Sequence, residues 1–146
     1  MDRLRRFMGL SPANRWLLIQ ACLILLLVVV LTRLLPFSAL RSLLARVSRA
    51  DRATRERRPH SVETLVWATK TASRYLLVTS CLKRALLVYI LLWRNGHSAN
   101  LRIGVTLDEE KRGFAAHAWV ENEGKVVVGK GAGISRYKVI YSQGGS

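Results

Sequence analysis

The sequence predicts an α+β fold, with helices in its first part and antiparallel strands at its end. Up to residue 93 the apolar residues recur every three or four positions, whereas from residue 101 they alternate with other residues. The pair Asn95-Gly96 separates the two patterns, because glycine readily adopts the left-handed conformation that ends a helix. The length of 146 residues suits one modest core and is too short for two enzyme domains.

The first predicted helix is the run Trp16–Leu31, which is apolar except for Gln20. At 1.5 Å per residue this run would span roughly 24 Å, which is less than the ~30 Å hydrocarbon core of a bilayer. We therefore expect a buried or interfacial helix that packs on the rest of the chain. A membrane span and a signal peptide are the alternatives. The corresponding expectation for localisation is a cytoplasmic protein, bound to a membrane at most peripherally through its arginines.

Two more helices are predicted before residue 79. Pro36 ends the first helix, and Ser38 is the expected N-cap of the second. The charged stretch 51–60 indicates a linker, and Ser61 is the expected cap of the third helix. The apolar stripes of these helices are Leu40, Leu43, Leu44 and Val47, and then Val62, Leu65, Val66 and Thr69. This organisation predicts a helical extension over residues 1–60 and a second domain over residues 61–146.

The charge of the chain is strongly positive, with 24 Lys plus Arg against 9 Asp plus Glu and a formal charge of +15. Residues 1–60 contain 12 Arg, no Lys and 3 acidic residues. An Arg-rich segment with a long apolar run indicates an anionic partner or a membrane surface, beside the plain alternative of a solvated basic surface. No nucleic-acid-binding signature accompanies the arginines, so we expect no nucleic acid as a partner.

The cysteines and histidines exclude several classes of site. Two cysteines, Cys22 and Cys81, are too few for a disulfide scaffold or a four-cysteine zinc site. The three histidines have no cysteine or carboxylate at ligand spacing, and the phosphate-binding glycine motifs are missing. We therefore expect neither a metal nor a cofactor, and we assign Cys22, inside the apolar run, a packing role.

The strand pattern of the last part predicts an antiparallel sheet. Asp108–Gly113 is expected to form a polar turn, and Glu123-Gly124 a tight turn. Alternation along the second strand puts His117, Trp119 and Glu121 on one face. The four predicted strands are Leu101–Leu107, Phe114–Glu121, Lys125–Gly129 and Arg136–Ser142.

Cys81 and His117 are the candidate catalytic residues. Cys81 lies at the start of a predicted helix with Thr79 or Ser80 as its cap, where free N–H groups stabilise a thiolate or an oxyanion. His117 follows on a strand, flanked by small alanines. Each residue alone is more often structural. Together they match the way in which papain-like and transglutaminase-like sites combine a helix-start nucleophile with a general base on a strand.

The sequence around this pair resembles one family specifically. The segment SCLKRALLVYILLWRNGHSANLRIGV at residues 80–105 and the segment AHAWVENEGKVVVG at residues 116–129 carry the resemblance. They are similar to the transglutaminase-like leader peptidase of lasso-peptide biosynthesis, the B protein family that is also named after microcin processing. The resemblance covers residues 61–142, and the helical first part matches more loosely.

The resemblance implies a transglutaminase- or papain-like core that removes the leader of a ribosomally made precursor peptide in the cytoplasm. In the family's Cys-His-Asp triad, Cys81 would be the nucleophile and His117 the base. The position of the family's Asp is Gly129 here. A backbone carbonyl, a water or an acid from residues 108–110 is left to orient the imidazole, since Glu121 would lie roughly 13 Å away.

The resemblance also implies partners. An ATP-dependent macrocyclase closes the ring after the leader is removed. No winged-helix recognition module fits residues 1–60, so a separate leader-recognition protein of that type is expected to hold the precursor's leader. Two alternatives stay open. One is a non-catalytic peptide- or membrane-binding protein with a degenerate fold of this kind, and the other is a different acyl-transfer enzyme on the same fold.

Overall fold

The computed structural model describes residues 2–50, 60–78, 80–131 and 133–145, and its helices precede its strands. This confirms the predicted α+β class. The predicted linker at residues 51–60 lies outside the described residues except for His60. The elements are α1 (Asp2–Met8), α2 (Pro12–Leu34), α3 (Phe37–Ala50), α4 (Val62–Tyr75), α5 (Cys81–Arg94), β1 (Ala99–Asp108), β2 (Gly113–Asn122), β3 (Lys125–Val128), the 3-10 turn η1 (Ile134–Arg136) and β4 (Lys138–Gly145).

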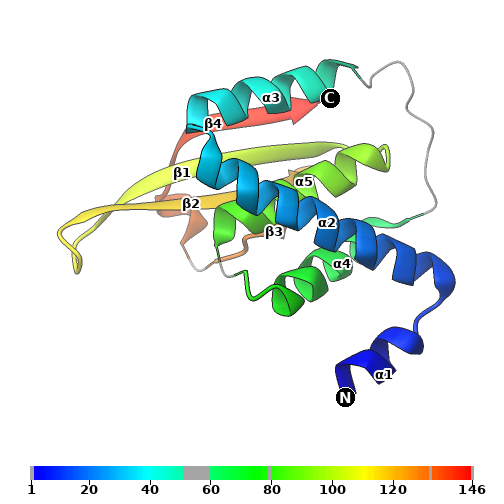
Figure 1. The fold of residues 1–146 in the computed structure, drawn as a ribbon. Coiled ribbons are helices and arrows are strands. Elements are labelled where there is room, and N and C mark those ends of the chain that lie inside the picture. Colours follow the sequence, from blue (N-terminus) through cyan, green and yellow to red (C-terminus); the bar gives the residue numbers. More distant parts are fainter. Residues whose placement is uncertain (1, 51–59, 79, 132, 146) are drawn as a thin grey trace.

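The strands form one antiparallel sheet in the order β3-β2-β1-β4 (Figure 1). The long hairpin of β1 and β2 is in continuous register, with Gly104 opposite His117. The predicted turn at Glu123-Gly124 is confirmed, because both residues have a positive φ, as a two-residue hairpin turn requires. An irregularity in the pairing of β2 and β3 places Val128 opposite Val120, one residue beyond the partner that a regular two-residue hairpin would give.

The helices cover one face of the sheet. α5 contacts β1 and β2, and α2 and α4 pack on α5 and on each other. Figure 1 shows α2 crossing α5 on the side away from the sheet, so α2 is the outermost layer of this packing. The core that joins helices and sheet includes Leu25 of α2, Leu65 of α4, Leu87 of α5, Leu101 of β1 and Val120 of β2.

α2 is longer than the sequence predicted. It starts at Pro12, where Ser11 Oγ accepts a hydrogen bond from the backbone N–H of Asn14, and it runs 23 residues to Leu34. At about 35 Å it is long enough to cross a bilayer. The expectation that it is too short was therefore wrong, and among the described residues it is the one helix long and apolar enough to span.

One face of α2 nevertheless belongs to the protein core. Its buried residues are at most 4% exposed, and they pack in the cluster that includes α4 and α5. The prediction that this helix packs on the rest of the chain is confirmed. Arg15 ties α2 to α1, because its guanidinium donates to the carbonyls of Met8 and Leu10. The buried residues of α2 are Leu17, Leu18, Ala21, Leu25 and Val28.

α3 begins one residue before the predicted cap. Ser38 is the second residue of the helix rather than its N-cap, because the backbone N–H of Leu40 already donates to the Pro36 carbonyl. Leu40 and Leu44 are buried as predicted, whereas Leu43 is exposed. The side chain of Val47 lies outside the described residues.

Aromatic and cationic contacts hold α3 against β4. The ring of Phe37 meets the ring of Tyr141 edge-on, with centroids 5.7 Å apart. The guanidinium of Arg41 lies over the same tyrosine ring at 5.2 Å. Burial raises the pKa of Tyr141, and the charge of Arg41 opposes that rise.

The next two helices begin as the sequence predicted. Ser61 Oγ accepts a hydrogen bond from the backbone N–H of Thr64, so Ser61 caps α4. Ser80 is the N-cap residue of α5, although its side chain makes no capping hydrogen bond, and Thr79 lies outside the described residues. Cys81 is therefore the first residue of α5, as expected.

Candidate active site

Cys81 occupies a position at which a helix can assist catalysis. The first backbone hydrogen bond at this end runs from Arg84 N–H to the Ser80 carbonyl at 3.3 Å. The N–H groups of residues 81–83 precede that bond and have no partner inside the helix. The Ser80 side chain does not cap them either. These N–H groups lie beside the half-buried Cys81, where they can bind an oxyanion.

His117 lies in the middle of β2 with its ring held from three sides. Its Nε2 is 2.7 Å from the carbonyl oxygen of Gly129. Because a carbonyl only accepts, Nε2 carries the proton, and Nδ1 is left with the lone pair that a general base needs. The ring stacks on Trp119 with centroids 6.1 Å apart and lies 5.5 Å from the ring of Tyr137.

The backbone carbonyl of Gly129 therefore holds the His117 ring, at the position where the resemblance described above would place an Asp. The sequence left a backbone carbonyl, a water or an acid from residues 108–110 as the partner of the imidazole, and among the described residues the partner is a backbone carbonyl. Asp108 lies at the far end of the hairpin, four pairs from His117 in the β1–β2 register. Glu121 is also engaged elsewhere, because it accepts hydrogen bonds from Arg102 Nε and Trp119 Nε1, both at 3.0 Å.

The two candidate residues are associated with different faces of the sheet. Ala118 and Val120 belong to the core that includes α5, and strand alternation therefore points His117 and Trp119 toward the opposite face. Cys81 packs at the edge of that same core. Among the described residues the structure records no hydrogen bond between Cys81 and His117. It brings His117 together with Trp119, Tyr137 and Gly129 instead.

Two parts of the His117 environment escaped the sequence analysis. Tyr137 lies between η1 and β4, because the strand predicted from Arg136 begins only at Lys138, and strand alternation alone gave no partner for its ring. Gly104, directly opposite His117, leaves room for Tyr137 and Trp119, because a Cβ there would lie 2.8 Å from Tyr137 Cβ and 3.0 Å from the Trp119 ring. The sequence did offer one signal, because a glycine inside an alternating strand, as at Gly104, often marks a place where another group approaches the backbone closely.

Gly129 yields a stability prediction. Gly129 has φ +86°, and an added Cβ would lie 2.6 Å from the Ala118 carbonyl oxygen. We expect Gly129→Ala to lower the free energy of unfolding by about 2–4 kcal/mol, because backbone strain and a clash with backbone add. Urea unfolding measures this. Gly124→Ala is the matched control, since φ is +79° there and no atom lies within 4 Å of the added Cβ. Equal losses in both variants would contradict the clash.

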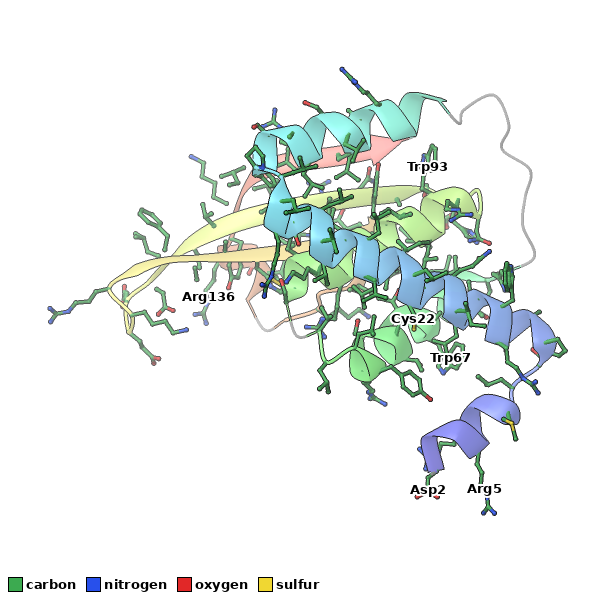
Figure 2. All side chains as sticks on the ribbon, in the orientation of Figure 1. Asp2, Arg5, Cys22, Trp67, Trp93 and Arg136 are labelled. Carbon is green, nitrogen blue, oxygen red and sulfur yellow. The ribbon has the colours of Figure 1, made fainter. Side chains whose placement is uncertain are left out.

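The second cysteine is separate from this site. Cys22 lies in α2, on the side toward α4 and near Trp67, as Figure 2 shows. Burial raises the pKa of its thiol, which keeps it protonated and unreactive near neutral pH. No group of three or more histidines, cysteines or carboxylates that could hold a metal occurs among the described residues.

A cavity of about 580 Å³ adjoins the His117 side of the sheet. It lies between the β1–β2 hairpin and the η1 segment, and Tyr137 lines it as well as contacting His117. Its wall includes the carboxylates Asp108, Glu109 and Glu110 and the guanidinium of Arg136. Figure 2 shows Arg136 at this end of the molecule, below β2.

Comparison with known proteins gives one match. The family model of the Transglutaminase-like superfamily matches residues 23–142, from the middle of α2 to β4. No curated protein and no solved structure matches the chain significantly. The match contains both Cys81 and His117, and it includes about half of the apolar helix α2.

Proposed function

Because the chain belongs to the transglutaminase-like superfamily, which includes cysteine peptidases, we propose that it removes the leader from a ribosomally made lasso-peptide precursor before macrocyclisation. The observation that carries the proposal is the position of Cys81 at the first residue of α5, with the N–H groups of that turn uncapped by Ser80. The sequence blocks at residues 80–105 and 116–129 supply the substrate class, through their resemblance to leader peptidases.

The proposed reaction has two halves. His117 takes the proton of the Cys81 thiol, and the thiolate so formed attacks the carbonyl carbon of the last leader residue, while the N–H groups at the start of α5 stabilise the oxyanion. The C–N bond breaks, and His117 gives its proton to the departing amine, which becomes the N-terminus of the core peptide. Water, deprotonated by His117, then hydrolyses the thioester. This step releases the leader as a carboxylate and restores the thiol.

The proposal includes a separate leader-recognition protein. The helices α1, α2 and α3 account for the described part of residues 1–60, and none of these residues forms a strand of a winged-helix module. A second protein that binds the leader and this chain together would raise the local concentration of the scissile bond at Cys81. The ATP-dependent macrocyclase would act afterwards on the freed amine.

Cleavage of the precursor tests the proposal directly. The substrate is the precursor peptide encoded in a reading frame beside that of this chain, and mass spectrometry identifies the products. We expect one cut, slow with this chain alone and at least tenfold faster when the recognition protein is added. Full-speed cleavage without the partner would show that this chain binds the leader itself. Failure to cleave with the partner present would contradict a peptidase.

A second candidate function is favoured by one observation. Alternation along β2 associates His117 with the face opposite the core of α5, and the Asp of the family's triad is replaced by Gly129. Both features suit a non-catalytic protein of the same fold that binds a peptide without cutting it. Such a protein would bind the precursor with the recognition protein present and return it intact.

A further inference from the structure

α2 exposes a continuous apolar stripe to solvent. Six large apolar side chains at helical spacing along its outer side are between 41% and 74% exposed. They extend over 19 residues, or about 27 Å of helix. Monomeric soluble proteins seldom expose a patch of this kind without a partner. The outer stripe of α2 consists of Trp16, Ile19, Leu23, Leu27, Val30 and Leu34.

The opposite side of the same helix is part of the core. Leu17, Leu25 and Val28 are at most 4% exposed and pack in the cluster that α4 and α5 share. A transmembrane α2 would have to leave this core. An α2 that lies in the plane of a membrane surface keeps it and still removes the outer stripe from water.

Exposed arginines flank the stripe. Arg5 precedes it in α1, Arg33 lies beside its last residue, and Arg46 follows in α3. Figure 2 shows Arg5 projecting from α1, away from the rest of the fold. Guanidinium groups at the ends of an apolar helix favour the headgroup region, where their stems cover apolar surface and their charges meet phosphate.

The stripe could be covered by a second copy of the chain or by a membrane surface, and the charge of the chain favours the membrane. A second copy of the chain would bring two molecules of charge +15 into contact, which opposes association. An anionic bilayer carries the complementary charge and offers an apolar layer of the depth that a helix face needs. The aromatic ring of Trp16 stands at one end of the stripe, and tryptophan is enriched at membrane interfaces.

We propose that the chain binds the surface of an anionic phospholipid bilayer through the outer stripe of α2, with the helix in the plane of the interface. Two contributions add in this binding: the apolar stripe inserts into the interface, and the flanking arginines are attracted to lipid phosphates. The fold remains intact, because the core side of α2 stays on α4 and α5. The inference is independent of whether Cys81 is catalytic.

Co-sedimentation with vesicles tests the proposal on the full chain. The vesicles are pure phosphatidylcholine or phosphatidylcholine with 30% phosphatidylglycerol, and the variant is Leu23→Glu with Leu27→Glu. The control, Leu77→Glu with Leu107→Glu, adds the same charge at leucines that are 79% and 70% exposed. We expect the unmodified chain to bind tightly only to the anionic vesicles. The α2 variant should bind them at least tenfold more weakly than the control does. An alkaline wash should release the bound protein.

Three results would overturn the proposal. Equal binding of the α2 variant and the control would show that the stripe does not touch lipid. Retention through high salt and alkali until detergent is added would identify a membrane span. Absence of vesicle binding, together with a dimer in sedimentation equilibrium that the α2 variant abolishes, would assign the stripe to a second copy of the chain.

Discussion

Replacing Cys81 by alanine is expected to abolish leader removal, with a loss of at least about 10⁴-fold in the rate of cleavage. The proposed reaction passes through a thioester on Cys81, which alanine cannot form. Cys81 is half-buried at the first helical residue, where alanine keeps the helix geometry. The urea midpoint should therefore change little, and the loss of cleavage would be chemical rather than structural.

The second cysteine provides the control for this variant. Cys22→Ala should retain cleavage, because Cys22 lies in α2 between packed side chains. Alkylation by iodoacetamide adds a readout that needs no substrate. Burial raises the pKa of Cys22, so its thiolate fraction near neutral pH is small and should grow only as the pH approaches that raised value. Normal cleavage by Cys81→Ala, or alkylation of Cys22 as fast as of Cys81, would contradict this assignment.

Local signals predicted most of the secondary structure because each depends on a few neighbouring residues. Ser61 could be identified as a cap, and Glu123-Gly124 as a tight turn, since both geometries are set within four residues. The ends of α2 were missed because hydropathy alone marked the apolar run. Pro12, a favourable first-turn residue, and Ser11, its cap, extend the helix into polar sequence.

Non-local geometry limited what could be predicted for the site. Alternation correctly grouped His117, Trp119 and Glu121 on one face of β2. It could not say which face the helices cover, because both faces carry apolar side chains, Ala118 and Val120 on one and Trp119 on the other. The one-residue irregularity between β2 and β3 also escaped. The resemblance identified position 129, and the contact that its carbonyl makes with His117 became visible only in the fold.

The role of His117 is the point at which the peptidase and the binding protein differ most, and His117→Ala should reveal it. If His117 is the general base, cleavage should fall by about 10²–10⁴-fold. The matched control is His97→Ala. His97 is a half-buried histidine whose Nε2 is also bonded to a backbone carbonyl, that of His60, at 2.8 Å. Each variant loses one such hydrogen bond, worth about 1 kcal/mol, and His117→Ala also loses the ring contacts with Trp119 and Tyr137.

Comparing His117→Ala with His97→Ala distinguishes a catalytic role of His117 from a purely structural one. If His117 is only structural, both variants should cleave at similar rates, whereas loss of a base should slow cleavage far beyond what the measured change in stability explains. The rate of Cys81 alkylation at neutral pH is the second measurement on each variant. Alkylation needs the thiolate but no proton transfer to a leaving amine, so it reports on the nucleophile separately from cleavage. If His117→Ala cleaves as fast as His97→Ala, His117 does not act as the base. Its ring then only holds Trp119 and Tyr137 against the sheet, as its recorded contacts already do.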